Sequence, residues 1–408
     1  MTRYLPRTLE TFLTKASRRF PVLLVTGARQ VGKTTLFKHA AGQRRRVITL
    51  DDPMVLALAR QEPALLLSRF KPPLLIDEIQ YAPELLAHIK MHVDDQGKPG
   101  DFWLTGSQHF HLMRNVSESL AGRVAVLRLL GLSRAELQGV KSALPFLPEP
   151  KAVNQRARQA RPMSLMELYN LIWRGSFPMP ALDPKMDRDL FYGSYVQTYL
   201  KRDVRDLAQV GDELAFTKFL RACAARTAQM LNLSDLARDV GVATNTAKRW
   251  LSILEASGLV YLLEPFYSSR SKRLTKTQKL YFLDTGLAAY LTAWSSPETL
   301  EAGAMSGAVL ETWVVAEVLK SYWHNGLEAP LFYYRDKDKR EIDLLLVKDQ
   351  VLFPVEIRKT AGPGKGDTRN FSALKAQGLQ VGPGAVLCLV EQHMPLAKGV
   401  DAIPVWMV

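Results

Sequence analysis

The sequence contains few cysteines and no long apolar run. Only two of its 408 residues are cysteine, Cys223 and Cys388, and neither belongs to a Cys-x-x-Cys pair or to a Cys/His cluster with zinc-ligand spacing. We therefore expect neither a disulfide framework nor a zinc site. No apolar stretch approaches the ~18 residues that a membrane-spanning helix needs, and residues 1–13 lack the apolar core of a secretory signal. These absences predict a cytoplasmic protein without a membrane segment.

Acidic residues are outnumbered: 54 lysines and arginines stand against 40 aspartates and glutamates, which gives a formal net charge of +14. An enzyme for a neutral metabolite does not need this excess. It suits a polyanionic partner, either nucleic acid or an anionic membrane surface, although an ordinary basic surface remains the alternative. With 47% hydrophobic residues, the length predicts two or three domains, each with its own core.

One short segment carries the strongest functional signal. Residues 27–34 follow the phosphate-binding pattern Gly-x-x-x-x-Gly-Lys-Thr, between an apolar strand expected at 20–26 and a helix expected at 34–40. In such a loop, backbone N–H groups bind phosphate oxygens, the lysine reaches the β- and γ-phosphates, and the threonine hydroxyl holds Mg²⁺. We therefore predict binding of ATP and Mg²⁺, with Thr34 as a metal ligand. The residues predicted to bind the nucleotide are Gly27, Gly32, Lys33, Thr34 and Thr35.

Two carboxylates follow an apolar segment that is expected to form another strand of the same sheet. Asp77 and Glu78 come directly after residues 74–76. Because a phosphate-binding loop lies at the carboxyl ends of parallel strands, Asp77 can hold the Mg²⁺ and its water shell. Glu78 can polarise the attacking water as general base. A dedicated base favours ATP hydrolysis over nucleotide storage.

Two further residues extend the predicted catalytic set. Ser107 follows the apolar segment 102–105, where a polar side chain could contact the γ-phosphate or orient the water; an ordinary strand-end turn is the alternative. Arg123 precedes the fifth expected strand, where a ring-forming ATPase would present an arginine to the neighbouring subunit. Such a guanidinium stabilises charge on the transferring phosphoryl group. An arginine of the surface or sheet edge is the alternative.

The apolar pattern predicts a parallel α/β domain at residues 1–140, because short apolar segments alternate there with helical ones. Its expected strands are 20–26, 46–50, 73–76, 101–105 and 124–129. Ser133 and Glu136 form a capping box that is expected to open the next helix. Residues 141–165 are rich in proline and basic residues and are expected to be a linker or an exposed insertion.

The remaining chain is expected to form two domains, at residues 166–295 and 296–408. The first is helical, with no strand expected before residue 257 and two strands around a basic turn within 259–284. The second opens with a long apolar helix at 304–321. Its expected strands lie near 331–335, 341–347, 351–357 and 385–390.

A helix-turn-helix pattern lies within the middle domain. A short helix capped by Ser234 is expected to end at Gly241, and a second helix is expected at 244–254. The exposed face of the second helix is predicted to contact DNA through Thr244, Asn245, Lys248 and Arg249. The basic turn, with the cations Arg270, Lys272, Arg273, Lys276 and Lys279, completes a segment that resembles a winged helix. Its predicted DNA contacts are Arg270, Lys272, Arg273 and Lys276. A winged helix that serves only as a lid or as a protein-docking module is the alternative.

The C-terminal domain carries acidic residues in a pattern similar to that of PD-(D/E)xK nucleases. Asp343 precedes a strand that bears Glu356, and Glu311 on the preceding helix fits the third acidic position. Asp343 and Glu356 could share a Mg²⁺. The usual lysine position holds Arg358, which cannot lose its proton but can still bind phosphate. We favour a degenerate nuclease-like α/β domain that binds DNA or packs structurally; a plain strand pair with charged ends is the alternative.

Taken in order, these motifs resemble one family along nearly the whole chain. The segments that carry the resemblance are 27–35, 50–53, 75–80, 104–107, 120–123, 175–178, 199–204 and 279–287. They are similar to the AAA+-type ATPases with a C-terminal domain of unknown function, AAA_14 with DUF4143. The resemblance implies an AAA+-like P-loop NTPase core, ATP hydrolysis, and a homo-oligomer such as a hexameric ring.

The sequence is compatible with three functions. The first is an ATPase that binds DNA and remodels it or translocates on it, which uses every motif above. The second is a nucleotide-gated nuclease, which needs Glu311, Asp343 and Glu356 to bind metal. The third is a signalling or protein-remodelling ATPase whose winged helix is a docking surface. Salt-dependent DNA binding distinguishes the third from the other two, and metal-dependent DNA cleavage identifies the second.

Overall fold

The computed structural model describes residues 4–42, 45–107, 116, 118–140, 143–200, 213–267, 277–376 and 378–408. The chain divides into two compact units. Unit 1 comprises Met1–Leu132 with Ala256–Leu259 and Trp323–Leu327. Unit 2 comprises Ser133–Glu255, Val260–Tyr322 and Glu328–Val408.

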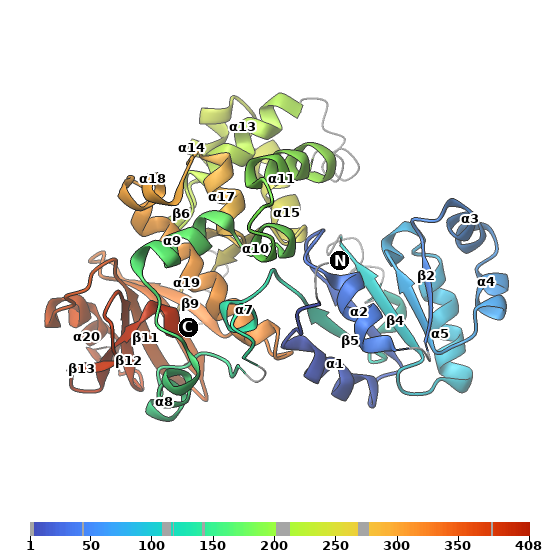
Figure 1. Ribbon diagram of the computed structural model, residues 1–408, viewed down its shortest axis with the longest axis horizontal. Coiled ribbons are helices and arrows are strands. Elements are labelled where there is room, and N and C mark those ends of the chain that lie inside the picture. The colour runs from blue at the N-terminus through green and yellow to red at the C-terminus, as the bar shows by residue number, and fades with distance from the viewer. Residues whose placement is uncertain are drawn as a thin grey trace. The chain divides into compact units, whose positions relative to one another are not determined.

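Unit 1 is built on a five-stranded parallel sheet, and its strands lie where the apolar segments predict them (Figure 1). The strands are β1 (Val22–Thr26), β2 (Arg46–Thr49), β3 (Leu74–Asp77), β4 (Phe102–Gly106) and β5 (Val124–Arg128). Their spatial order is β2-β3-β4-β1-β5, and all four neighbouring pairs are parallel. Strand β4 therefore separates the strand that leads into the phosphate-binding loop from the strand that ends in Asp77.

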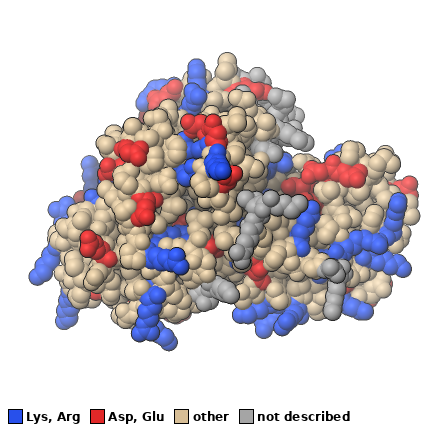
Figure 2. Space-filling model, in the orientation of Figure 1, with Lys and Arg blue, Asp and Glu red and all other residues tan. Residues whose placement is uncertain are grey.

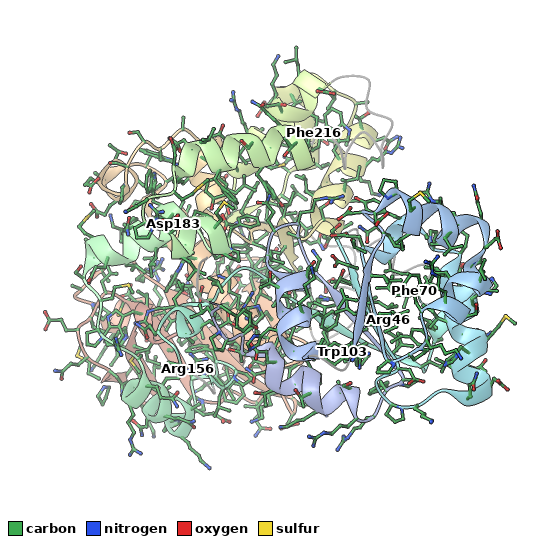
Figure 3. The ribbon with its side chains drawn as sticks, turned by 45° about the vertical axis from the view of Figure 1, so that its right-hand side comes forward. Arg46, Phe70, Trp103, Arg156, Asp183 and Phe216 are labelled. Carbon is green, nitrogen blue, oxygen red and sulfur yellow. The ribbon has the colours of Figure 1, made fainter. Side chains whose placement is uncertain are left out.

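Helices cover both faces of this sheet because its central strands are apolar on both sides. They are α1 (Leu9–Ser17), α2 (Lys33–Ala41), α3 (Pro53–Gln61), α4 (Pro63–Arg69) and α5 (Leu85–Gln96), with a short 3-10 turn, η1 (Ile79–Tyr81). Alternate strand residues such as Leu24, Ile76 and Leu104 share one core with residues of α3, α4 and α5. On the other face lies Trp103, which is labelled in Figure 3. Its ring stacks on that of Phe37 of α2, with ring centroids 4.9 Å apart.

Unit 2 begins with α7 (Arg134–Leu137), whose capping box between Ser133 and Glu136 is formed as predicted. The stretch 141–165, expected to be a linker, contains a helix, α8 (Pro150–Gln159). Its first residue is a proline, which suits the first turn of a helix. Val153 and Arg156 are buried, and Arg156 Nη1 donates to the Met407 carbonyl at 3.0 Å (Figure 3). This segment is therefore packed against the C-terminus.

Helices and a small sheet follow. The helical elements are α9 (Leu165–Arg174), α10 (Pro178–Leu182), α11 (Arg188–Tyr195), a π-helical turn at Val196–Leu200, α13 (Glu213–Ala224), α14 (Leu233–Val240), α15 (Thr244–Ala256), α17 (Thr285–Leu291) and α18 (Pro297–Ala302). The strands are β6 (Gln229–Met230), β7 (Val260–Leu263) and β8 (Lys279–Phe282), in the antiparallel order β6-β8-β7. The expectation of no strand before residue 257 is wrong at β6, because two residues are too short to show a period.

A buried polar cluster ties two of the motif segments together. Asp284 caps α17 through a 2.7 Å bond from Leu287 N, and its carboxylate also accepts bonds from Ser176 N and from Tyr192 Oη at 2.6 and 2.8 Å. Gly175, at φ 79°, approaches so closely that an added Cβ would lie 2.2 Å from Tyr192 Oη. These motif residues therefore serve the packing of unit 2.

The C-terminal part of unit 2 is a six-stranded mixed sheet. Helix α19 (Ser306–Trp323) leads into strands β9 (Leu331–Arg335), β10 (Glu341–Lys348), β11 (Val351–Ile357), β12 (Gly384–Cys388), β13 (Met394–Ala397) and β14 (Val400–Pro404), with short turns η3 (Lys365–Phe371), α20 (Ser372–Ala376) and η4 (Val405–Met407). Their order is β13-β14-β12-β11-β10-β9. Strands β11, β12 and β14 are mutually parallel, and the other neighbours are antiparallel. Among all the residues described, no helix has the length and apolarity needed to cross a membrane.

Candidate active site

The phosphate-binding loop joins β1 to α2 at the carboxyl edge of the unit 1 sheet. Gly27 has φ 152°, and a Cβ there would lie 2.1 Å from the Leu129 carbonyl oxygen. Gly32, at φ 95°, is the N-cap of α2. Because side chains are excluded at the first position and disfavoured at the second, the spacing of the two glycines follows from the shape of the loop. The N-terminus of α2 thereby faces the loop, as anion binding requires.

Lys33 lies over the centre of this loop. Its side chain is 4% exposed, and its Nζ donates to the carbonyls of Gly27 and Ala28 at 3.0 and 2.9 Å. An ammonium held within such a loop is positioned to meet any phosphate bound by the loop's backbone N–H groups. Thr34 follows in the first turn of α2 and is half-buried, whereas Thr35 is exposed.

Thr34 and Asp77 are brought into direct contact. Thr34 Oγ1 donates to the Asp77 carboxylate, at 2.8 Å from Oδ1 and 3.1 Å from Oδ2. Thr105 of the intervening strand β4 donates to Asp77 Oδ1 at 2.5 Å. Since Asp77 is 6% exposed and Thr105 fully buried, the carboxylate is fixed from two sides. A hydroxyl and a carboxylate so placed are the oxygen donors that Mg²⁺ prefers.

Glu78 is held by three polar residues of the site: Thr105, Gln80 and Ser107. Its backbone has φ 60° and ψ 48°, a conformation uncommon for a residue other than glycine. Its N–H donates to Thr105 Oγ1 at 3.0 Å, while its carboxylate accepts bonds from Gln80 Nε2 and, at 3.2 Å, from Ser107 Oγ. Gln80 Nε2 also lies 3.1 Å from Ser107 Oγ. Ser107 therefore contacts the predicted base.

Arg123 lies at the other edge of the sheet. It directly precedes β5, and its carbonyl accepts a bond from Val22 N at the start of β1. Because the strands are parallel, this is the edge opposite the phosphate-binding loop of the same chain. Arg123 Nε donates to Asp94 Oδ1 at 2.5 Å, and Nη1 donates to the Ala121 carbonyl at 3.0 Å. Its predicted role at the site of a neighbouring subunit stays a prediction.

Three residues near the site were not identified from the sequence: Arg7, Gln80 and Thr105. Arg7 is 6% exposed, and its guanidinium donates to the carbonyls of Val31 in the loop, Leu130 and Gly131, at 3.0, 2.8 and 3.1 Å. No spacing rule could have found it, because it reaches the loop from a different part of the chain. Gln80 and Thr105 lie inside the quoted motifs, and only the strand order explains their contacts.

The predicted DNA-contacting residues fall into two groups. Thr244, Asn245, Lys248 and Arg249 lie on α15 and are exposed, while Ala247, Trp250 and Leu251 are buried. Helix α14 starts at Leu233 with Asn232 as its N-cap, which corrects the expected cap at Ser234. Gly241, at φ 79° and ψ 33°, ends the helix as the turn requires. The second group, Arg270, Lys272, Arg273 and Lys276, lies outside the described residues.

The predicted C-terminal acidic residues lie close together. Lys279, which the sequence placed in the basic turn, is instead buried among them. Lys279 Nζ lies 3.4 Å from Glu311 Oε1, 2.6 Å from Glu341 Oε1 and 3.9 Å from Asp343 Oδ1. Burial would lower the pKa of Lys279, but attraction by Glu311, Asp343 and Glu341 outweighs it and raises this pKa. Burial, together with repulsion by Asp343, raises the pKa of Glu311 to about 7.

The third predicted acidic residue, Glu356, is paired with Arg358. It is 2% exposed, and burial followed by repulsion from Asp343 raises its pKa to about 8, although Arg358 opposes the shift. Glu356 Oε1 accepts a bond from Arg358 Nη2. In the part of the chain described, no group of three or more His, Cys, Asp or Glu side chains could hold a metal ion. The geometry is that of a lysine-centred ion cluster rather than of a metal site.

Comparison with known proteins agrees with the order of motifs. The family model AAA_14, described as "AAA domain", matches residues 19–138, and DUF4143 matches residues 306–408. Between them, a domain of unknown function, DUF8612, matches residues 166–298. The chain belongs to the AAA-type P-loop ATPase family with a C-terminal DUF4143 domain.

Two relatives match this chain over nearly its whole length. The uncharacterized proteins Rv2008c of Mycobacterium tuberculosis and Mb2031c of Mycobacterium bovis are each 30% identical over 399 residues, which is 96% of this chain and 82% of theirs. Among solved structures, a Walker-type ATPase of Pyrococcus abyssi has 14% identity and a TM-score of 0.44 over 69% of this chain and 94% of its own. RuvB of Thermotoga maritima has 17% identity and a TM-score of 0.31, over 62% of this chain and 88% of its own.

Proposed function

We propose that this family member binds ATP with Mg²⁺, hydrolyses it, and uses the energy for work on DNA. The observation that carries the first part is the contact between Thr34 and Asp77. A P-loop threonine hydroxyl lies 2.8 Å from a buried carboxylate at the tip of another strand, beside a lysine that is 4% exposed. This is the donor arrangement that nucleotide-bound Mg²⁺ requires in P-loop ATPases.

Each residue then has a defined task. The loop N–H groups between Gly27 and Thr35 bind phosphate oxygens, and Lys33 neutralises the β- and γ-phosphates. Thr34 and Asp77 would hold the Mg²⁺, which would offset the charge that develops on the phosphates. Thr105 supports Asp77 by a hydrogen bond of 2.5 Å, so the carboxylate keeps one orientation. No reorganisation of these groups is then needed during the reaction.

Glu78 would accept the proton of the attacking water. Its contacts with Ser107 and Gln80 orient the carboxylate before water arrives. Ser107 follows β4 and Glu78 follows β3, so the two neighbouring strands supply the base and its support. A general base placed in this way typically contributes 10²–10⁴-fold to the rate.

The proposal for DNA rests on unit 2 and on charge. The order α13-β6-α14-α15-β7-β8, with a three-stranded antiparallel sheet, supports the winged-helix interpretation. The second helix of the pair exposes Thr244, Asn245, Lys248 and Arg249, which can contact phosphates and base edges. Figure 2 shows lysine and arginine side chains distributed over the visible surface, with acidic side chains among them. The net charge of +14 favours the same polyanionic partner.

The ATPase rate measured with no DNA and with single-stranded, duplex and branched DNA tests this function. We expect phosphate release to depend on Lys33 and to rise with at least one DNA form. Binding measured at several salt concentrations should show log K falling linearly with log salt. Changing both Lys248 and Arg249 to alanine should reduce that slope by about 2, whereas Lys218→Ala on α13 is the matched control. ATP hydrolysis without any salt-dependent DNA binding would favour the protein-remodelling alternative.

A further inference from the structure

The ion cluster of unit 2 is formed by the Lys279 ammonium and three carboxylates. Lys279 comes from β8, in the segment interpreted as a winged helix, and it is 3% exposed. It meets carboxylates of two other elements: Glu311 from α19, and Glu341 and Asp343 from β10. The last two residues are two positions apart on one strand and so lie on the same face of the sheet.

Neighbouring contacts fix this arrangement. Tyr281, two residues after Lys279 on β8, donates its hydroxyl to Glu311 Oε1 at 2.6 Å. Asp343 Oδ2 accepts a bond from Ile357 N of β11 at 2.9 Å. Both carboxylates that fit the nuclease-like pattern around Lys279 therefore have a second partner that holds their orientation.

The third carboxylate of the pattern has its own cation. Arg358 binds Glu356 Oε1 and, through Nε, lies 3.5 Å from Asp367 Oδ1. Glu356 Oε2 is buried and accepts no hydrogen bond in the described structure. Two protein cations thus face the three carboxylates that a nuclease of this pattern would use for a metal ion.

We propose that Lys279 replaces the divalent cation of this nuclease-like site. A dication placed between Glu311 and Asp343 would meet the ammonium at close range, and like charges in a poorly solvated site repel strongly. The site does not fit a metal ion, and its carboxylates instead tie β8 to α19 and β10. The domain is therefore a metal-independent connector between the winged-helix-like segment and the C-terminal sheet.

Removing the ammonium should uncover a metal site, and this is the test. Binding of Mn²⁺ would be followed by electron paramagnetic resonance on the full chain without nucleotide, in a Lys33→Ala background that keeps the ATP site out of the measurement. The protein with Lys279 intact should bind no Mn²⁺ that depends on Asp343. Lys279→Met should bind one Mn²⁺ per chain, and Lys279→Met with Asp343→Asn should lose it.

Lys320→Met is the matched control. Lys320 is also a buried lysine of unit 2, and it pairs with Glu317 at 2.8 Å, away from the cluster. This variant should gain no Mn²⁺ binding, so a general effect of losing a buried charge is excluded.

Two results would overturn the proposal. One is Asp343-dependent Mn²⁺ binding while Lys279 is intact, a comparison that does not require the Lys279 variant to fold. The other is a folded Lys279→Met chain that binds no Mn²⁺. Neither result depends on ATP hydrolysis, so the proposed ATPase function stands or fails separately.

Discussion

Thr34 Oγ1 donates a hydrogen bond to Asp77 Oδ1 across 2.8 Å, although the two residues are 43 positions apart in the sequence. Strand β4 lies between the strands that lead to them and adds Thr105 to the same carboxylate. This relationship unites two separate motifs into one site.

Lys33→Ala and Glu78→Gln should fail in different ways. Lys33→Ala removes the cation that meets the phosphates, so ATP binding itself should be lost. Glu78→Gln should bind ATP with near-normal affinity but hydrolyse it 10²–10⁴-fold more slowly, because only proton transfer is impaired. A fluorescent ATP analogue measures binding, and phosphate release measures turnover. Lys38→Ala, an exposed change on α2, is the control; an equal loss of binding in both variants would contradict the role of Glu78.

Arg123 should act across a subunit boundary, because it lies at the sheet edge opposite its own loop. Arg123→Ala subunits mixed with Lys33→Ala subunits should recover part of the ATPase rate, since one intact loop then meets one intact arginine. Lys33→Ala mixed with Glu78→Gln should recover none. Absence of recovery in a mixture shown to co-assemble would rule out this role.

Arg7 should influence nucleotide binding through the loop. Arg7→Met removes hydrogen bonds to Val31, Leu130 and Gly131 and leaves buried carbonyls without these donors. We expect the KM for ATP to rise about 10-fold, a change of roughly 1.4 kcal/mol, with a smaller effect on kcat. Arg18→Met, at an exposed position of the same segment, is the control. A lower melting temperature with unchanged ATP affinity would show that Arg7 has only a structural role.

Glu356 should make unit 2 less stable as the pH rises. Its folded-state pKa of about 8 lies above the ordinary 4.5, so the folded chain keeps a proton that the unfolded chain has lost. The stability contributed by this proton is complete below pH 4.5 and is lost as the pH rises through about 8. Glu356→Gln mimics the protonated form, so its unfolding temperature should fall less between pH 5 and pH 8.

The difference at pH 8 should be on the order of 2 kcal/mol in favour of the Glu356→Gln variant. Thermal unfolding at both pH values measures it. Glu391→Gln, at an exposed position of the same unit, should leave the pH dependence unchanged. Parallel loss of stability in Glu356→Gln and the unaltered chain would contradict the raised pKa.

The predicted nucleotide site follows from local rules of sequence. The glycines at 27 and 32 follow from the loop geometry, and Asp77 follows from an apolar strand that ends in a carboxylate. The same rules cannot predict strand order. The contacts of Thr105 with the Asp77 carboxylate and with the Glu78 N–H are therefore known only from the structure. Arg7 reaches the loop by tertiary contact and leaves no local pattern.

Sequence motifs alone could not predict the composition of the C-terminal ion cluster. Glu311, Asp343 and Glu356 were predicted as possible metal ligands, and their proximity in the fold agrees with the pattern. Lys279 comes from a strand outside this acidic pattern. The sequence placed it in the basic turn, because no spacing rule connects it to these carboxylates. Strand β6 was missed because it has two residues. Strand β13 was missed because two of its four residues are exposed and it contains Pro395, and the five-residue strand β14 was missed as well.

The polar cluster around Asp284 affects how genetic results on this protein should be interpreted. Gly175 cannot accept a side chain, and its neighbours Tyr192 and Asp284 belong to unit 2, whereas the nucleotide loop belongs to unit 1. A screen for loss of activity will therefore recover Gly175 variants that never contact the reaction. Their signature will be a low cellular amount of the protein, because a chain that packs poorly is degraded. Abundance must be measured alongside activity before such a residue is assigned to catalysis.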